Sequence, residues 1–443
     1  MNASVAGQLA PEGTAAAFAA ALGSANIAFA RRTEAEKLRK AVEHIARATV
    51  ESGDIPGVVV QIWREGELCC DVVAGVRDRE RNVPMDRSTL FGIASMTKPI
   101  TVALALRLVD EGKLRLDDTI ARWVPELAQM RVLRRHDGPL DDTVAAKRSI
   151  TVEDLMTHRA GLAYGFLAPP PLGTALLARV GMGIDSALTP DGWLKSLSEL
   201  PLIFQPGERF NYGHSIDVLG FLAARVLGQD LGTAMREKLF APLGMVDTGF
   251  WVPPEKRSRL APFYISPQRG EFTPANVAAF TADEPREYVS GGQGLVATAD
   301  DYLRFARMLM NEGKLDRVRV LKAETVRMMR SNRFSDEQRK FPFVAGAPFN
   351  QGFGLGMSVA IEANRPGVVS GGVGTFGWPG AFGGWWQADP RADMILLWLQ
   401  QCTPAPPQPG GAMPRLPGQQ GLLQFRKAVS DAMNGEAHAN LTG

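Results

Sequence analysis

The pattern of hydrophobic and polar positions predicts a helix and a hairpin near the start of the chain. Thr33–Glu36 has the form of a capping box, and residues 34–50 place apolar side chains on one stripe, which is typical of an amphipathic helix. Residues 57–63 and 67–74 are rich in β-branched side chains and flank a short polar turn, which predicts a β-hairpin. Residues 100–109 are apolar on nearly every face, so this helix should be fully buried.

The pattern changes between residues 116 and 287, where short helical segments alternate with connections rich in Pro and Gly. Helices are expected there at residues 151–158, 215–227 and 232–240. The later residues predict a helix, three strand-like runs and a final amphipathic helix, at 299–311, 354–362, 384–388, 394–400 and 422–433.

These elements predict an α+β protein in which both chain ends build one sheet domain. We expect this domain to comprise residues 34–115 and 288–435, with a mostly helical domain, residues 116–287, inserted between the two parts. Residues 1–33 are interpreted as an N-terminal extension, and the stretch rich in Pro, Gly and Gln at 404–421 as a surface loop.

Composition narrows the class of protein. The chain has 443 residues, of which 45% are hydrophobic, enough for a large core and unlike a disordered chain or a small disulfide-stapled fold. A net charge of +2 gives no reason to expect nucleic acid or a membrane surface as a partner. The Ala-rich stretch at 14–30 lacks a basic start, so a secretory signal is not favoured and a cytoplasmic location is expected. No feature specifies an oligomeric state.

Metal and imidazole chemistry have little support in the residue types. Cys69 and Cys70 are adjacent and Cys402 is distant, so neither a disulfide framework nor a C-x-x-C pair is expected. The motif H-E-x-x-H is absent and the chain has only five histidines. We therefore expect no metal and no cofactor, and a base other than histidine if the protein is a hydrolase.

Ser95 and Lys98 form the one S-x-x-K in the chain, at the expected start of the buried helix. Positions i and i+3 share a helix face, which would bring the serine hydroxyl beside the lysine amine. The N–H groups and partial positive charge at a helix start can stabilise an oxyanion. Pro99 fits only an early turn, which places Ser95 at the start. A lysine accepts a proton only when neutral, a form that burial favours.

Two further segments could take part in the same chemistry. Tyr212 lies in a turn-rich approach to the helix expected at 215–227. The glycines of Gly377–Gly384 permit close approach of a substrate, and the N–H of Ala381 could stabilise an oxyanion. Taken one at a time, the tyrosine is better explained as structural and the glycine-rich segment as a tight turn without function, and a capping serine with a solvated lysine is a fair alternative for the S-x-x-K.

Together, and in this order, the segments resemble the serine β-lactamase and penicillin-binding-protein superfamily. Within it they are most similar to the family VIII carboxylesterases, which resemble class C β-lactamases. The resemblance implies a central antiparallel sheet flanked by helices, with the active site in the cleft between the two domains. It rests on seven segments: Asp54–Gly57, Phe91–Pro99, Thr151–Leu162, Phe204–Tyr212, Pro242–Met245, Gly291–Asp300 and Trp378–Gly380.

The resemblance implies a role for each matched residue. Ser95 would be the nucleophile, Lys98 and Tyr212 the coupled base, and the N–H groups of Ser95 and Ala381 the oxyanion hole. Substrate contacts are expected from four residues: Tyr164, His214, Trp378 and Gly380. His158 is expected to be structural.

Two departures from the lactamase motifs favour a neutral substrate. Y-x-N is replaced by Tyr212-Gly213-His214, and K-T-G is replaced by Trp378-Pro379-Gly380. The lysine of K-T-G supplies positive charge for a substrate carboxylate, whereas tryptophan offers an apolar ring and one N–H. The sequence therefore predicts a carboxylesterase acting on short-chain, neutral, small-molecule esters.

Three other functions share these motifs: a β-lactamase or D-amino-acid peptidase, an acyltransferase, and a non-catalytic penicillin-binding-like protein. An α/β-hydrolase does not fit, because no serine has glycine at both −2 and +2, as its nucleophile elbow requires.

Overall fold

The computed structural model describes residues 35–339, 342–344, 347–348, 351–405 and 415–441. The predicted N-terminal extension, residues 1–33, lies outside the described residues, as does most of the loop predicted at 404–421.

One eight-stranded sheet joins the two ends of the chain, and every neighbouring pair of its strands is antiparallel. The N-terminal strand β1 lies between its hairpin partner β2 and the late strand β18, with Val59 opposite both Leu399 and Val73. The prediction of an α+β fold with an antiparallel sheet built from both ends is confirmed. The order across the sheet is β14 (Gly352–Phe353), β15 (Ser358–Val359), β16 (Phe376–Gly377), β17 (Trp385–Asp389), β18 (Met394–Leu399), β1 (Gly57–Arg64), β2 (Glu67–Asp78) and β3 (Val83–Pro84).

The strand predicted at 354–362 is wrong in extent. Its first residues form a turn, in which Gly354 N–H donates to the Met357 carbonyl and Gly356 has a positive φ of 80°. Strand geometry is restored only at Ser358–Val359. The continuous apolar run therefore contains a tight turn that its hydrophobicity did not reveal.

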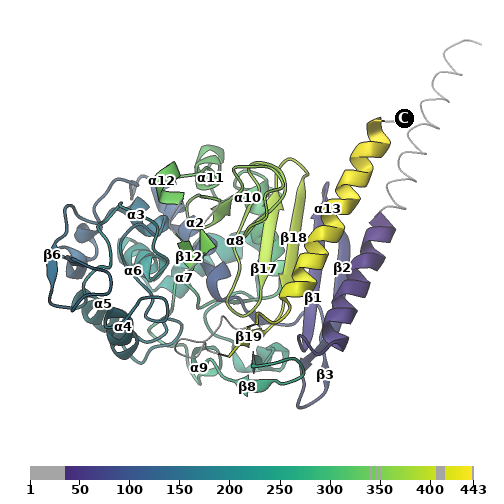
Figure 1. The fold of residues 1–443 in the computed structure, drawn as a ribbon, viewed down its shortest axis with the longest axis horizontal. Coiled ribbons are helices and arrows are strands. Elements are labelled where there is room, and N and C mark those ends of the chain that lie inside the picture. The colour runs from purple at the N-terminus through teal and green to yellow at the C-terminus, as the bar shows by residue number, and fades with distance from the viewer. Residues whose placement is uncertain (1–34, 340–341, 345–346, 349–350, 406–414, 442–443) are drawn as a thin grey trace, which may run out of the picture.

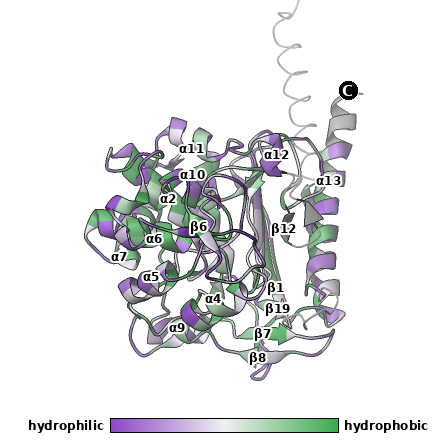
Figure 2. Cartoon of the chain, turned by 60° about the vertical axis from the view of Figure 1, so that its left-hand side comes forward, coloured by the Kyte–Doolittle hydropathy of each residue, from purple (hydrophilic) through white to green (hydrophobic). Residues whose placement is uncertain are grey.

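The first and last described helices cover one face of the sheet. The helix at residues 35–51 and α13 (Gln419–Leu441) lie beside β1 and β2 (Figure 1). Val42 and Phe425 from these helices share a buried core with Val60 and Trp398 of the sheet. In Figure 2 α13 carries hydrophilic residues along its length, whereas α6 (Ser215–Leu227), in the other layer, is largely hydrophobic.

Helices α2 (Thr97–Asp110) and α10 (Ala299–Met310) lie on the other side of the sheet, where α10 contacts β17 and β18. The helix predicted at 100–109 is buried at residues 100–106 and at Leu108, whereas Arg107 and Val109 are only partly buried. Helix α2 also packs against α6, so Ser95, just before α2, sits where the sheet layer meets α6.

The inserted region, whose boundaries at 116 and 287 stay a prediction, holds short helices and four short strands. Strand β7 pairs with β19 (Cys402–Pro404) in parallel. No helix of the described residues is long and apolar enough to cross a bilayer. The elements are β5 (Arg131–Leu133), β6 (Thr143–Ala145), α3 (Val152–Met156), α4 (Leu172–Val180), α5 (Pro190–Ser198), α6, α7 (Leu231–Met235), α8 (Ala241–Leu243), β7 (Phe263–Ser266), β8 (Thr273–Ala275) and α9 (Ala278–Thr281).

Candidate active site

Ser95 lies in a single 3-10 turn, Ala94–Met96, that leads directly into α2. The chain enters this turn with Ala94 at φ +44°, a left-handed conformation that costs a residue with a Cβ about 1–2 kcal/mol. Ala94 is buried, so the surrounding packing holds it there. Pro99 is the third residue of α2, in the first turn as predicted. Ser95 is 8% exposed, and α2 begins two residues beyond it.

The three residues expected to carry the chemistry meet at the Ser95 hydroxyl. Lys98 Nζ lies 3.0 Å from Ser95 Oγ, and the Tyr212 hydroxyl donates to the same oxygen at 2.7 Å. Lys98 is fully buried, and its amine stands 4.6 Å from the centroid of the Tyr212 ring. One hydroxyl is therefore in contact with both groups that could remove its proton.

Trp378 sets the direction in which the Tyr212 hydroxyl donates its proton. Its Nε1–H donates to the Tyr212 oxygen at 3.2 Å, so the tyrosine proton is directed toward Ser95 Oγ. The serine proton is then free to point at Lys98 when the amine is neutral. Trp378 is fully buried beside the Tyr212 ring, with centroids 5.6 Å apart. Its N–H is thus occupied by Tyr212, and the substrate contact expected of its ring stays a prediction.

A backbone carbonyl that the sequence did not single out completes the surroundings of the lysine. Lys98 Nζ donates to Gly292 O at 2.8 Å. The N–H of Gly292 donates at 2.9 Å to the carboxylate of Asp217, which is fully buried in the first turn of α6. The one available signal for this carboxylate was an acidic residue within the apolar run 215–227.

The glycine-rich loop packs directly against the nucleophile turn. A Cβ added at Gly380 would lie 2.5 Å from Ile93 O, and one at Gly384 would lie 2.8 Å from Met96 Sδ. Only glycine permits this approach. Ala381 lies between them, and its carbonyl accepts from Thr403 Oγ1 at 3.0 Å. The segment expected to supply the second oxyanion donor is therefore adjacent to the segment that carries the nucleophile.

Tyr164 and His214 are buried next to the reactive cluster, that is, Ser95, Lys98 and Tyr212. Tyr164 is 1% exposed and His214 is fully buried, with their rings 4.5 Å apart. Burial and the nearby charge of Asp217 raise the pKa of Tyr164 well above its usual range, so its phenol stays protonated. His214 Nδ1 lies 3.2 Å from Asp217 Oδ2. The substrate contacts expected of these two residues stay predictions that their burial does not favour.

His158 makes hydrogen bonds and a ring contact to the segment that carries Tyr212, which is consistent with the structural role expected of it. Its Nδ1 accepts from Gly213 N–H at 3.4 Å, its carbonyl accepts from Asn211 N–H at 2.8 Å, and its ring lies 4.7 Å from that of Tyr212. Burial and the neighbouring charge of Lys98 lower the pKa of His158 well below 6.5, so the imidazole is neutral.

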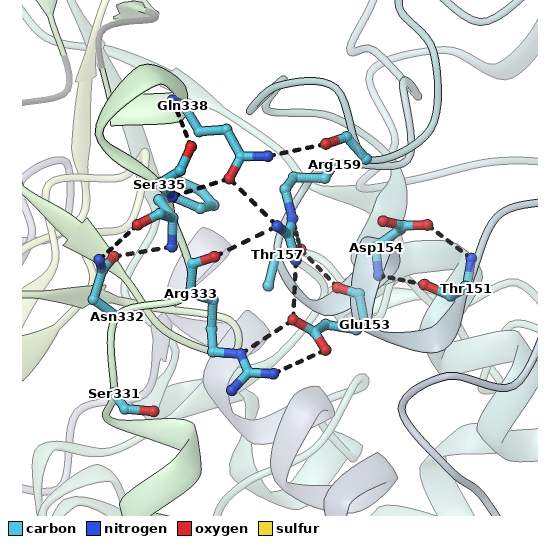
Figure 3. A network of polar contacts seen from close by, with 12 residues as sticks. Thr151, Glu153, Asp154, Thr157, Arg159, Ser331, Asn332, Arg333, Ser335 and Gln338 are labelled. Carbon is cyan, nitrogen blue, oxygen red and sulfur yellow. Dashed lines mark hydrogen bonds and ion pairs between the residues drawn. The ribbon is translucent and has the colours of Figure 1, made fainter. Parts of the chain in front are cut away.

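A cluster of ion pairs and hydrogen bonds centred on Glu153 and Arg159 anchors the loop before Tyr212 (Figure 3). Glu153 of α3 accepts from Arg159 at 3.0 Å and from both nitrogens of the Arg333 fork, at 2.9 and 3.1 Å. Gln338 Nε2 donates to the carbonyl of Gly207, whose own N–H donates to Arg159 O. The cluster joins α3, the chain after α11 (Ala323–Met329) and the loop that leads to Tyr212.

Within the described residues, no three side chains of His, Cys, Asp or Glu are grouped as ligands for a metal ion. The expectation of catalysis without metal or cofactor stays a prediction.

The fold and the cluster around Ser95 define an enzyme of the serine hydrolase class with a β-lactamase-like fold. The Beta-lactamase family model matches residues 42–415, and the chain belongs to this family.

Three known proteins illustrate the relationship. Protein Rv1367c of Mycobacterium tuberculosis is 46% identical over 362 residues, which cover 81% of this chain and 88% of that protein. Esterase EstB of Burkholderia gladioli is 31% identical over 363 residues, covering 77% of this chain and 85% of the esterase. The solved structure of EstCE1, described as a hydrolase with promiscuous acyltransferase activity, has a TM-score of 0.73 at 28% identity and covers 89% of this chain and 99% of its own.

Proposed function

We propose that the protein is a carboxylesterase that hydrolyses short-chain neutral esters through an acyl-enzyme on Ser95. The observation that carries the proposal is the convergence of Lys98 and Tyr212 on Ser95 Oγ, at 3.0 and 2.7 Å, with Trp378 in place of the lysine of K-T-G. The relationship to esterase EstB supports it.

The first half of the reaction forms the acyl-enzyme. Ser95 Oγ attacks the ester carbonyl while its proton passes to the neutral amine of Lys98. The N–H groups of Ser95 and Ala381 stabilise the oxyanion. As the tetrahedral intermediate collapses, the Tyr212 hydroxyl gives its proton to the leaving alkoxide and regains one from Lys98. The alcohol departs neutral, and the acyl group stays on Ser95.

The second half repeats these steps with water. The amine of Lys98, directly or through Tyr212, takes a proton from the attacking water, and the acyl oxygen of Ser95 leaves and is reprotonated. The products are a carboxylic acid and the restored hydroxyl. Every proton is returned within the trio.

The substrate class follows from the charge at the site. Trp378 supplies no positive charge, and its indole N–H is occupied by Tyr212. An anionic β-lactam or peptide carboxylate would lose the electrostatic attraction that a lysine provides, whereas a neutral ester loses nothing.

Hydrolysis of p-nitrophenyl butyrate by Ser95→Ala and Tyr212→Phe tests the assignment. We expect Ser95→Ala to abolish turnover, and Tyr212→Phe to lower kcat by about 10²- to 10⁴-fold, the contribution of a general acid–base group. Mass spectrometry of the quenched wild type should show one acyl adduct on Ser95. Full activity in Ser95→Ala would refute the nucleophile.

An acyltransferase is the second candidate, because EstCE1 is described as a hydrolase with promiscuous acyltransferase activity. Adding an alcohol acceptor to the butyrate assay distinguishes the two, since a transferase makes a new ester at the expense of butyrate. Nitrocefin and a D-Ala peptide test the β-lactamase and peptidase functions in the same assay format. A fluorophosphonate that labels the wild type but not Ser95→Ala excludes a non-catalytic protein.

A further inference from the structure

Asp217 is a buried carboxylate that the proposed reaction does not use directly. It is fully buried in the first turn of α6, one turn beyond Tyr212 and His214. Placing a carboxylate in a protein interior is costly unless each oxygen is hydrogen-bonded. The contacts of Asp217 therefore indicate what it serves.

The carboxylate holds the turn that faces Lys98. Asp217 Oδ1 accepts from Ser290 Oγ and from Gly292 N–H, and Gly292 O in turn accepts from Lys98 Nζ at 2.8 Å. The other side of the turn is held by α2, where Thr101 Oγ1 donates to Gly291 O. The position of the Gly292 carbonyl is thus set jointly by the carboxylate and by the helix that carries the lysine.

The turn and the carboxylate are in direct contact. A Cβ added at Gly292 would lie 2.9 and 3.0 Å from the two oxygens of Asp217 and 3.0 Å from the hydroxyl of Tyr164. Lys98 Nζ lies 5.4 Å from the centroid of that tyrosine ring. One residue, Gly292, therefore separates a buried negative charge from the amine that must take up a proton.

We propose that Asp217 is a positioning residue for the base: it holds the Gly292 carbonyl on Lys98 and supplies the negative charge that stabilises the ammonium formed when Ser95 is deprotonated. This inference rests on the function proposed above. A rigid, buried charge near a developing opposite charge requires no solvent reorganisation during the reaction, which makes it more effective than the same charge in water.

Other ionisable groups surround the carboxylate, and none duplicates its role. His214 lies on its own helix, and the phenols around it are held neutral where burial and the Asp217 charge raise their pKa values, as at Tyr164 and Tyr288. Asp185 also acts on Tyr288 and is paired with Arg286 at 2.6 Å. The ionisable side chains that interact with Asp217 directly are His214, Tyr164 and Tyr288, whereas Lys98 is reached through Gly292 and Tyr212 through Tyr164.

The pH profile of kcat/KM for p-nitrophenyl butyrate, compared between wild type and Asp217→Asn, tests the proposal. Asparagine keeps the size and an acceptor for Gly292 N–H but removes the charge. We expect kcat/KM to fall about 10- to 100-fold, below the about 10²- to 10⁴-fold due to a general base. Without the charge the ammonium formed in the reaction is less stable, so the acidic limb of the profile should move to lower pH.

Ser290→Ala is the matched control, because it removes the hydrogen bond to Asp217 and the one accepted from Gln293 N–H but leaves the charge and the Gly292 contact in place. We expect a smaller loss of activity with the acidic limb unmoved. Asp217→Ser, which also lacks the charge but is smaller, should reproduce the shifted limb if the Asn variant does not fold. An unmoved limb in the folded variants, or loss of folding in both while Ser290→Ala folds, would overturn the positioning role.

Fluorophosphonate labelling separates this proposal from the one on which it rests. Labelling and ester turnover that persist in Ser95→Ala would refute the nucleophile, and with it the base. Labelling that requires Ser95 but proceeds in Asp217→Asn at the wild-type rate and with the wild-type pH dependence would refute the role of Asp217 alone.

Discussion

The polar cluster around Lys98 and the one around Glu153 hold their cations in different ways. Glu153 accepts from both Arg159 and Arg333, at 3.0 and 2.9 Å, so the two guanidinium groups share one carboxylate (Figure 3). The Arg159 side chain is only 14% exposed, and this burial lowers its pKa from the usual value. In this cluster opposite charges are in contact, and the geometry of the ion pairs fixes three segments of chain.

Lys98 instead meets neutral groups. Its amine contacts the Gly292 carbonyl and the Ser95 hydroxyl and lies near the faces of the Tyr212 and Tyr164 rings. A carbonyl and a hydroxyl stabilise an ammonium less well than a carboxylate does. The two clusters thus differ in how charge is placed. The ion pairs of Glu153 hold segments of chain together by direct contact, whereas Gly292 separates the charge of Asp217 from the amine of Lys98.

The largest difference between the two clusters is expected when Lys98 and Arg159 are each replaced by methionine. Lys98→Met should lower kcat/KM by at least about 10²- to 10⁴-fold, because the base is lost. Its stability should change little, since removing a buried amine offsets the unsatisfied Gly292 carbonyl, a cost of about 1–3 kcal/mol. Arg159→Met should do the reverse, retaining most activity with a lower unfolding midpoint. Ester assays and urea denaturation of both variants check this, and equal effects on both quantities would remove the contrast.

The residues that the sequence predicted for the site are those whose type announces chemistry. Ser95, Lys98 and Tyr212 lie in recognisable segments, and the structure brings them together although the serine and the tyrosine are 117 positions apart in the chain. Trp378 was singled out for its missing charge, but its hydrogen bond to Tyr212 was not foreseen.

The groups that the sequence did not predict act through the backbone or through burial. Gly292 contributes a carbonyl to Lys98 from 194 residues away, and a carbonyl is the same for every residue type. Asp217 reads as an ordinary acidic residue in a first helical turn until its burial is known. The turn at Gly354 was missed because the residues around it are as apolar as those of a buried strand.

Neutralising the shared carboxylate tests the structural cluster itself. Glu153→Gln leaves Arg159 and Arg333 without a counter-charge, and we expect a loss of about 1–3 kcal/mol in the free energy of unfolding, less than the about 3–5 kcal/mol for a fully buried pair because Glu153 is 23% exposed. Urea denaturation measures it. Glu36→Gln, in an exposed pair with Arg39, is the control and should unfold as the wild type does.

His158, which packs against Tyr212, makes the stability of the fold depend on pH. Its pKa is well below 6.5 when folded, so below about pH 6.5 the unfolded chain binds a proton that the folded chain does not. The free energy of unfolding must then fall with decreasing pH, by up to about 1.4 kcal/mol per pH unit. His158→Asn keeps an acceptor for Gly213 and suits the positive φ of 53°.

Denaturation of the wild type and His158→Asn at pH 7.5 and 5.5 measures this difference. The variant should lose less stability between the two values, because the carboxylates contribute equally to both proteins. Replacement of the exposed His136 by asparagine is the control and should leave the wild-type loss unchanged. An equal loss in His158→Asn would show that the imidazole is not held neutral.

The smallest expected effect comes from Ala94. It tests whether the left-handed turn before Ser95 contributes to activity. Ala94→Gly relieves a left-handed conformation worth about 1–2 kcal/mol, but it adds the backbone entropy of glycine, about 0.5–1 kcal/mol, and removes a buried methyl group worth about 0.8 kcal/mol. These terms nearly cancel, so stability should change by less than about 1 kcal/mol. Activity should still fall about two- to fivefold, because a freer turn holds Ser95 less firmly against Lys98.

Asn82→Gly is the control, because it relieves a similar φ of +50° at an exposed turn and should leave kcat/KM unchanged. If both glycine variants kept full activity, the left-handed turn at Ala94 would be a feature of chain reversal alone, and the orientation of the serine would rest on its hydrogen bonds to Lys98 and Tyr212.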